Sequence, residues 1–446
     1  MKLVSAHKQI LSIFFSFFIL ISWNTIQAQE IWNLKQCIDT AQLFNKTLQI
    51  NRNNMAIGEQ KKKEAKANLL PKVMLNSDYK YFTDLPHQLM PLSTFNPMAP
   101  EGEFKEAQFG VPHNINANLQ LMMPIYSPQV YGAIQNTKVA SELTQLQYQK
   151  EVEQVLFDVT TLYFNAQILQ HQLDFIDGNM DNTQKLLKSM EQLHGQLMIK
   201  GTDVNKVKLK SEQLATQREN VFNRYMQILN ALKLQMGIAL NKDILVEKDI
   251  HFQVSTELTS RENLDVQLIQ TQNKLLNAEY KTLNRSRFLP SFSLVASYGT
   301  TGFGYDRKTD EFLKFYTVGF AGLQMTYPLF NGTVTQRKID QKKLELENNE
   351  LQSQLLNDKN QMETENASRQ RIVAQKIVFN SESQIELAQT IYDQTILQQE
   401  LGTASLTDVL LADNALREAQ QNYLTAIIEY LKADLELKKI MGLIID

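Results

Sequence analysis

Residues 152–197 read VEQVLFDVTTLYFNAQILQHQLDFIDGNMDNTQKLLKSMEQLHGQL, and they decide the fold. Alternate steps of three and four residues trace one seam that is apolar everywhere except at Thr183 and His194. A spacing of 3.5 residues keeps such a seam facing a partner helix along its whole length. The seam consists of Val152, Val155, Val159, Leu162, Ala166, Leu169, Leu173, Ile176, Met180, Thr183, Leu187, Met190, His194 and Leu197.

The helix around this seam extends over about residues 129–199, because no proline interrupts it after Pro128. A helix of about 70 residues is roughly 105 Å long at its usual rise per residue. No globular core has that length, so the sequence predicts a rod or a tube. The chain holds only 16 glycines and 10 prolines in 446 residues, which also favours long helices.

Residues 1–28 are predicted to be a secretory signal, because Lys2 and Lys8 precede an apolar run that ends in polar residues and Ala28. The alternative, a buried helix, fits the basic N-terminus poorly. The whole chain has a net charge of −3, and removing Lys2 and Lys8 makes it −3 − 2 = −5. This balance argues against a nucleic-acid partner. Cys37 is the only cysteine, so no internal disulfide forms.

Two stretches near residues 72–82 and 114–124 alternate with a period of two, as strands do. In the second stretch Ile115, Ala117, Leu119 and Leu121 lie on one face. The other face carries Asn114, Asn116, Asn118 and Gln120. This pattern suits a membrane strand beside a wet lumen, and it equally suits a half-buried antiparallel sheet. After the signal no apolar run approaches the length of a membrane helix, so only strands of a closed barrel would enter a bilayer.

The order helix, strand, strand, long helix, turn, helix is predicted twice. The first repeat is 29–240, with strands at about 72–82 and 114–124, the long helix at about 129–199 and a tip turn at 200–203. The second is 263–446, with strands at about 291–298 and 316–327, the long helix at about 334–400 and a tip turn at 401–404. Residues 241–262 are expected to be an irregular equatorial segment.

Smaller features complete this plan. We expect a helix over 31–67, an exposed loop over 85–112 and a glycine-rich connection over 299–304. Gly201 and Gly402 are predicted to end their helices as left-handed caps.

Four strands cannot close a membrane barrel, which needs about eight or more. Open strand edges cannot face lipid, so strands in a membrane require several copies of the chain. Two copies give eight strands and three give twelve. The last helix carries two neighbouring apolar seams, one through Leu416 and Tyr430 and one through Leu424 and Leu431. Two seams indicate two neighbours, as in a tube of helices. A soluble helical bundle with a small sheet remains the alternative.

The chain resembles the TolC-type outer-membrane efflux protein family over essentially all of its mature length. The resemblance rests on the duplicated order, on the strand entries at Pro71 and Pro290 and on three segments. These are KGTDVNKV (200–207), LGTASLTDVLLAD (401–413) and NYLTAIIEYLKADLELKKIMG (422–442). It implies a mainly α fold with a β-barrel contribution: a homotrimer with a 12-stranded barrel in the outer membrane, continuous with a periplasmic α-helical barrel.

The resemblance also implies a function and its partners. The chain would be a passive exit channel of a tripartite efflux or type I secretion system. Its partners would be a periplasmic adaptor (membrane fusion) protein, an inner-membrane pump of RND or ABC type and outer-membrane lipid. Adaptor docking would use the tip turns at Gly201, Thr202, Gly402 and Thr403. The barrel lumen would be lined by Asn114, Asn116, Asn118 and Gln120.

Asp408 matches a family position where acidic residues ring the pore, and three copies would form a constriction that favours cations. The alternative is a solvated aspartate in the first turn of a helix, where the helix dipole favours it. A second acidic position of the family is Leu411 here, so we expect an apolar constriction beside the charged one.

The chain carries no nucleophile elbow, HExxH motif or paired-carboxylate site, and its six histidines lack metal spacing. We therefore expect no enzyme activity, no cofactor and no metal. The competing function is a non-conducting structural or adhesive coiled-coil protein of the cell envelope. That function predicts unbroken heptads without amphipathic strand pairs, so the sequence favours the channel.

Overall fold

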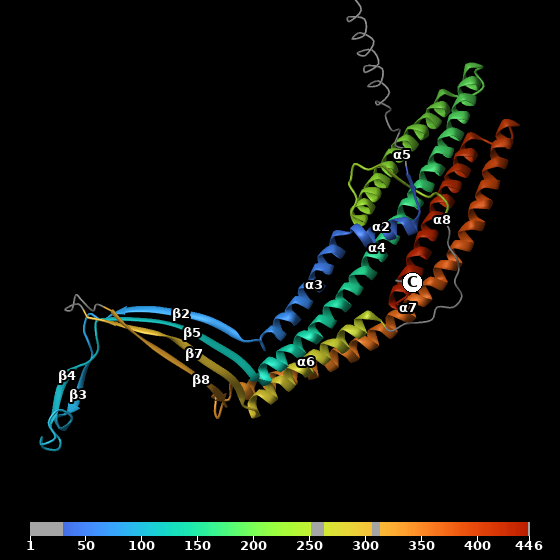
Figure 1. The fold of residues 1–446 in the computed structure, drawn as a ribbon. Helices are drawn as coiled ribbons and strands as arrows, with labels where there is room; N and C mark the ends of the chain where they lie inside the picture. The colour runs from blue at the N-terminus through green and yellow to red at the C-terminus, as the bar shows by residue number, and fades with distance from the viewer. Residues whose placement is uncertain (1–29, 251–262, 306–312, 445–446) are drawn as a thin grey trace, which may run out of the picture. The chain divides into compact units, whose positions relative to one another are not determined.

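The computed structural model describes residues 30–250, 263–305 and 313–444 (Figure 1). The predicted signal at 1–28 therefore lies outside the described residues. The chain forms two compact units. The helical unit comprises Met1–Gln49, Glu151–Glu262 and Asn360–Asp446, and the sheet unit comprises Ile50–Lys150 and Asn263–Lys359.

The sheet unit is built on four antiparallel strands in the order β2-β5-β7-β8 (Figure 1). Strand β2 is Lys72–Tyr81 and β5 is His113–Tyr126, while β7 is Ser291–Gly304 and β8 is Leu313–Thr326. Pro71 and Pro290 immediately precede β2 and β7, where a proline ends the incoming helix. The two edge strands are β2 and β8, and β5 and β7 lie at the centre.

Each of these strands continues a helix at one end. Helix α3 (Lys46–Ala67) leads into β2, and β5 leads into α4 (Pro128–Gly195). Helix α6 (Leu264–Phe288) leads into β7, and β8 leads into α7 (Val334–Glu400). Helices α4 and α6 approach closely, because a Cβ on Gly132 would lie 2.1 Å from Thr282 Cγ2.

The segment 85–112 is more ordered than the exposed loop that we predicted. It contains the hairpin β3 (His87–Pro91) and β4 (Phe104–Gln108), with a short 3-10 helix, Leu92–Thr94, between them. The prolines in this segment favour a loop, so the sequence analysis did not recognise the two short strands.

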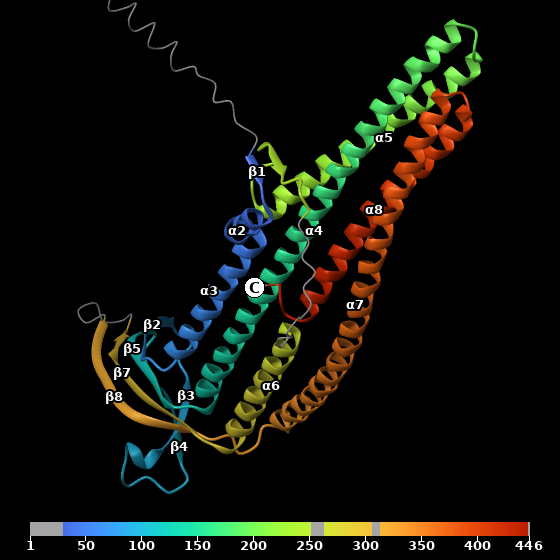
Figure 2. The same ribbon diagram turned by 90° about the vertical axis from the view of Figure 1, so that its right-hand side faces the viewer.

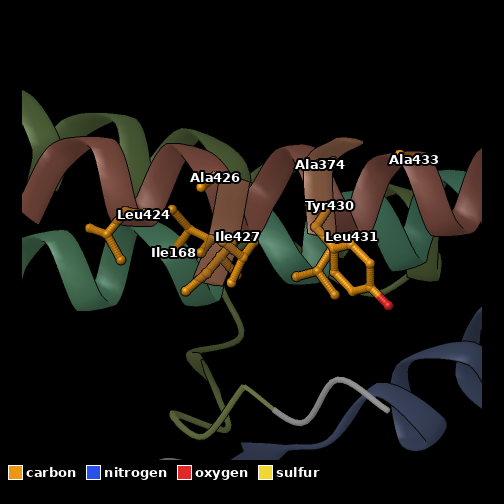
Figure 3. Packing of buried hydrophobic residues seen from close by; sticks show 9 residues of the cluster. Ile168, Ala374, Leu424, Ala426, Ile427, Tyr430, Leu431 and Ala433 are labelled. Carbon is orange, nitrogen blue, oxygen red and sulfur yellow. The ribbon is translucent and has the colours of Figure 1, made fainter. Parts of the chain in front are cut away.

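The helical unit packs α2 (Leu34–Phe44), α5 (Gly201–Met236) and α8 (Leu406–Ile440) with the adjoining parts of α4 and α7. Most of the seam of residues 152–197 faces inward, because Val159, Ala166 and Met190 are fully or almost fully buried, whereas Leu197 at its end is exposed. Figure 3 shows one cluster, where Ile168 of α4 and Ala374 of α7 meet the α8 residues Leu424, Ile427 and Tyr430. The coiled-coil periodicity thus forms the core of this unit.

The predicted helix over 31–67 is wrong at two places. Ile31 lies in strand β1 (Glu30–Trp32), which pairs in parallel with β6 (Ile244–Val246) inside the segment expected to be irregular. Asn45 then separates α2 from α3. Its Oδ1 accepts from the Leu48 N–H at 3.0 Å and its Nδ2 donates to the Gln235 carbonyl at 2.7 Å. An asparagine that caps one helix and reaches another interrupts a helix that local propensity alone would continue.

The glycine-rich segment 299–304 is strand rather than the predicted connection, because β7 runs through it to Gly304. A Cβ on Gly299 would lie 2.3 Å from the Ala117 carbonyl oxygen of β5. Glycine is used here for close strand approach rather than for a turn. Separately, no helix in the described ranges has both the length and the apolar character that crossing a membrane requires.

Candidate functional site

The two helical hairpins of the helical unit end side by side (Figure 2). The first turn joins α4, which ends at Gly195, to α5, which begins at Gly201. The second joins α7, which ends at Glu400, to α8, which begins at Leu406. Leu406 packs against Leu187, Met190 and Val207 of the first hairpin, so an apolar cluster holds the two tips together.

The two turns place the left-handed backbone conformation at different positions. Gly402 has a φ of 74°, as predicted for a left-handed cap. The prediction for Gly201 is wrong, because Gly201 and Thr202 begin α5 and Leu197 instead adopts the left-handed conformation with a φ of 62°. Leu197 donates its N–H to the His194 carbonyl, and His194 Nδ1 lies 3.0 Å from the Ile199 carbonyl oxygen. The first turn therefore spans residues 196–200. Thr202, Gly402 and Thr403 are exposed.

Asp408 and Ser405 form a capping box at the start of α8. Asp408 Oδ2 accepts hydrogen bonds from the Ser405 N–H at 2.8 Å and from the Ser405 hydroxyl at 2.7 Å. These bonds hold the pKa of Asp408 below its usual value, so its carboxylate is ionised at neutral pH. Asp408 therefore lies in the first turn of α8 and helps to cap it, which is the alternative to a pore residue that the sequence left open. Leu411, three residues further on, is 63% exposed.

A buried ion network that the sequence analysis missed lies two turns beyond the cap. Asp413 of α8 is only 7% exposed, and its Oδ1 accepts a hydrogen bond from Arg417 Nη2 at 2.9 Å. Lys210 Nζ of α5 lies 3.6 Å from Asp413 Oδ2 and also bonds Asn414, while Arg417 donates to Thr183 of α4 at 3.4 Å. Burial and the nearby Arg417 charge lower the pKa of Lys210. The network joins three helices.

The polar residues predicted on β5 share one face of the sheet. Asn114, Asn116 and Asn118 lie opposite polar residues of β2, and Gln120 lies opposite Met74. Asn116 Nδ2 donates to Asp78 Oδ2 at 3.2 Å, and Asn76 Nδ2 donates to Gln120 Oε1 at 3.2 Å. Asn114 donates to the Val111 carbonyl, and Asn118 lies opposite Asn76. The structure thus brings all four predicted residues onto one polar surface.

This polar surface does not reach the edge of the sheet at β8. By register, β8 continues the same face with Tyr316, Val318 and Phe320, all of which are exposed. The opposite face carries Val73, Leu119, Leu121 and Tyr298 on the other strands. On β8 itself it carries the exposed Phe315, Leu323 and Met325. Strand β8 is therefore largely apolar on both faces, which explains why its alternation is weak in the sequence.

The residues that the structure describes include no group of three or more His, Cys, Asp or Glu side chains that could hold a metal ion. Cys37 is fully buried, and burial raises the pKa of its thiol to about 12. The candidate functional features of the described residues are therefore the polar face of β5 and the charged network around Asp413.

Comparisons with known proteins agree on one family. The family model described as "Outer membrane efflux protein" matches residues 257–443. "Outer membrane protein TolC" of Salmonella enteritidis is 20% identical over 435 residues, which covers 95% of this chain and 84% of that protein. "Outer membrane protein TolC" of Escherichia coli (strain K12) is 22% identical over 433 residues, covering 92% of this chain and 82% of that protein.

Solved structures share the fold. The outer-membrane channel OprN has a TM-score of 0.74 at 12% identity, with 92% of this chain and 89% of that chain covered. The Campylobacter jejuni CmeC outer membrane channel has a TM-score of 0.72 at 16% identity, with 94% and 90% covered. The predicted fold class, mainly helical and of this channel type, is confirmed. The family model thus matches the second half of the chain, and over nearly its whole length the chain is similar to TolC-type efflux proteins of the outer membrane.

Proposed function

We propose that this chain is the passive exit channel of a tripartite efflux or type I secretion system. A periplasmic adaptor would dock at the tip turns, and an inner-membrane pump of RND or ABC type would supply substrate and energy. The observation that carries the proposal is the open sheet, because in the described residues β2 and β8 each pair with a strand on one side only. A strand edge in lipid leaves N–H and C=O groups without partners.

The open edges favour a ring of copies in which β8 of one chain pairs with β2 of the next. Such a contact joins two different surfaces and closes only at a fixed copy number. Three copies supply twelve strands, and twelve lies within the range of known membrane barrels. We infer a homotrimer whose apolar sheet face, with Val73, Leu119 and Leu121, contacts outer-membrane lipid.

The helical tip supports the docking part of the proposal. Next to the turns, α4 and α7 enclose a groove of about 310 Å³ lined by Asn182, Ser189, Tyr392 and Gln399 among others. The lining also includes the charged Lys185, Asp393 and Glu400 and the apolar Leu186 and Ile396. This mixed lining and the exposed Thr202, Gly402 and Thr403 suit contact with another helical hairpin.

The first test is the mass and conductance of the mature protein purified from outer membranes in mild detergent. We expect a protein mass of three chains, each slightly below the 51.3 kDa of the full sequence, and open-channel currents in planar bilayers. Adaptor and pump should co-purify after cross-linking in cells. A monomer mass, or recovery only from the soluble fraction, would refute the channel. A trimer without any conductance would instead favour a structural or adhesive protein of the envelope.

We also propose that Asn114, Asn116, Asn118 and Gln120 face the lumen. Single cysteines at Asn116 and Asn118 should react with a water-soluble maleimide in intact membranes, whereas cysteines at Leu119 and Leu121 should not. The native Cys37 can stay, because it is buried and its pKa is raised to about 12, so little of it is thiolate. Equal labelling of both pairs would rule out the assignment.

The arrangement of helices supports a further proposal, that 29–240 and 263–446 are two copies of one unit. In each, an antiparallel strand pair lies between an incoming helix and a long helix, as β2 and β5 do between α3 and α4. Superposing the two halves of an experimental structure would test it, and unrelated helix paths would contradict it.

A further inference from the structure

A basic groove of about 750 Å³ lies between α4 and α6 in the sheet unit. Four cationic side chains line it: Lys138 from α4 and Lys274, Lys281 and Arg285 from α6. Asn273, Asn277 and Gln135 add amide groups, and Glu142 is the only acidic residue in the lining. The groove thus collects positive charge in a chain whose total charge is −3.

The spacing of the three α6 cations places them along one side of the helix. Lys281 follows Lys274 by seven residues and Arg285 follows Lys281 by four, both of which return to the same face. In the described ranges none of the four cations of the groove forms an ion pair.

Neighbouring charged groups of the same unit do find partners. Glu279 of α6 is bound by Lys342 of α7 at 2.7 Å, and Lys150 pairs with Asp265. Arg287 bonds Gln336 and lies over the Phe288 ring. Because Glu279 is held by Lys342, it does not neutralise the groove. Four cations and the single carboxylate of Glu142 leave the groove with an excess of positive charge, and the resulting positive potential favours binding of an anion.

The groove adjoins the junction between strands and helices. Strand β5 ends at Tyr126 just before α4 begins at Pro128, and α6 ends at Phe288 just before β7 begins at Ser291. Pro128, Tyr131 and Arg285 line this end of the groove. Tyr131 is exposed, and exposed tyrosines gather where a membrane meets water.

The groove also belongs to one chain. Strands β5 and β7 are the two central strands of the sheet, and α4 and α6, which are joined to them, lie between α3 and α7 (Figure 2). Copies that add at the edge strands β2 and β8 leave a groove between α4 and α6 uncovered. The site therefore needs no contribution from another copy.

We propose that this groove binds a phosphate-bearing anion. The Arg285 guanidinium has the fork geometry that binds phosphate oxygens in pairs, and the three lysines act as point charges around it. Asn273 and Asn277 can donate to ester oxygens. Two sources present this chemistry: the headgroup of an anionic phospholipid at the inner surface of the outer membrane, and a soluble phosphorylated solute. The lipid source rests on the proposed membrane position of the sheet, whereas the soluble source does not.

The test uses the delipidated full channel and two probes, phosphatidylglycerol measured by native mass spectrometry and inorganic pyrophosphate measured by calorimetry. The variant is Lys274→Gln/Lys281→Gln/Arg285→Gln. The matched control is Lys61→Gln/Lys63→Gln/Lys66→Gln, which removes three exposed cations from α3 in the same unit. Losing three charged contacts should weaken binding at least about tenfold, whereas the control should stay within about twofold.

Each outcome decides the proposal. Loss of phosphatidylglycerol alone identifies the lipid headgroup, and loss of both probes identifies a general phosphate site. Equal binding by the wild-type channel, the variant and the control overturns the site, as does an absence of binding to either probe. If the triple variant fails to assemble, Arg285→Lys keeps the charge but removes the fork, and it should still weaken binding several-fold. A channel that conducts but binds neither probe would refute the groove and leave the proposed function intact.

Discussion

Replacing Asp413 by leucine should destabilise the helical tip by about 3 kcal/mol or more. Asp413 is the anion between two cations, with Arg417 Nη2 at 2.7 Å and Lys210 Nζ at 3.6 Å. Without it, Lys210 and Arg417 face each other in a mostly buried place with no counter-charge. Removing one member of a buried ion pair usually costs about 3–5 kcal/mol, because the remaining charge stays desolvated.

The measurement is amide hydrogen exchange over residues 401–417 in the detergent-solubilised protein, where opening of the tip raises the exchange rate. Arg417→Met should have a smaller effect than Asp413→Leu, because Lys210 still faces Asp413. The triple variant Lys210→Met/Asp413→Leu/Arg417→Met should recover most of the loss, because no unpaired charge remains. If it exchanges as fast as Asp413→Leu alone, the network is not the cause.

An exposed ion pair provides the control for this experiment. Asp181 and Lys185 on α4 form an i,i+4 pair in which both side chains are largely exposed. Asp181→Leu should change local stability by less than about 1 kcal/mol, because solvent screens such pairs. A large effect at Asp181 would mean that any charge loss in this region destabilises the tip, independent of burial.

The sequence predicts those parts of the fold whose cause is local. The 3.5-residue seam of 152–197 and the period of two around Asn116 come from how each residue repeats along its own element. The four predicted lumen residues share a face because strand alternation alone places them there.

The parts that were missed depend on residues far apart in the chain. Asn45 interrupts a helix by binding Gln235, 190 residues away, and β1 forms only because β6 lies beside it. Asp413 and Arg417 look like an ordinary surface pair at i,i+4 until Lys210 and Thr183 enclose them. Gly299 resembles a loop residue unless the Ala117 carbonyl of β5 is known to lie against it.

Removing the Asp408 charge should weaken block of the channel by a multivalent cation about tenfold or more. In the proposed trimer three copies of α8 bring three Asp408 carboxylates together at the narrow end of the tube. In the single chain two hydrogen bonds from Ser405 lower the pKa of Asp408, which favours the ionised carboxylate. A trivalent cation binds to these carboxylates by charge attraction, and Asp408→Asn removes that attraction. A loss of about 1.4 kcal/mol in binding free energy already lowers the affinity of the blocking cation tenfold.

The control separates charge from helix capping. Asp408 also caps α8, so Asp408→Asn changes the helix start as well as the charge. Ser405→Ala removes a capping hydroxyl, at a cost of about 1 kcal/mol, but keeps the carboxylate. In single-channel recordings Ser405→Ala should leave cation block and ion selectivity nearly unchanged. If it matches Asp408→Asn, the effect comes from the helix start and not from a ring of charge.

Leu411 provides the second half of this prediction. It lies one turn beyond Asp408 on α8 and is 63% exposed in the single chain, where an apolar side chain of this size has nothing to cover it. Three such side chains meeting in the trimer would exclude water beside the carboxylates. Leu411→Gly should therefore raise the resting conductance, while Leu411→Met, with similar volume, should not. An unchanged conductance in Leu411→Gly, together with unchanged block in Asp408→Asn, would place the constriction on other residues and leave Asp408 as a solvated helix cap.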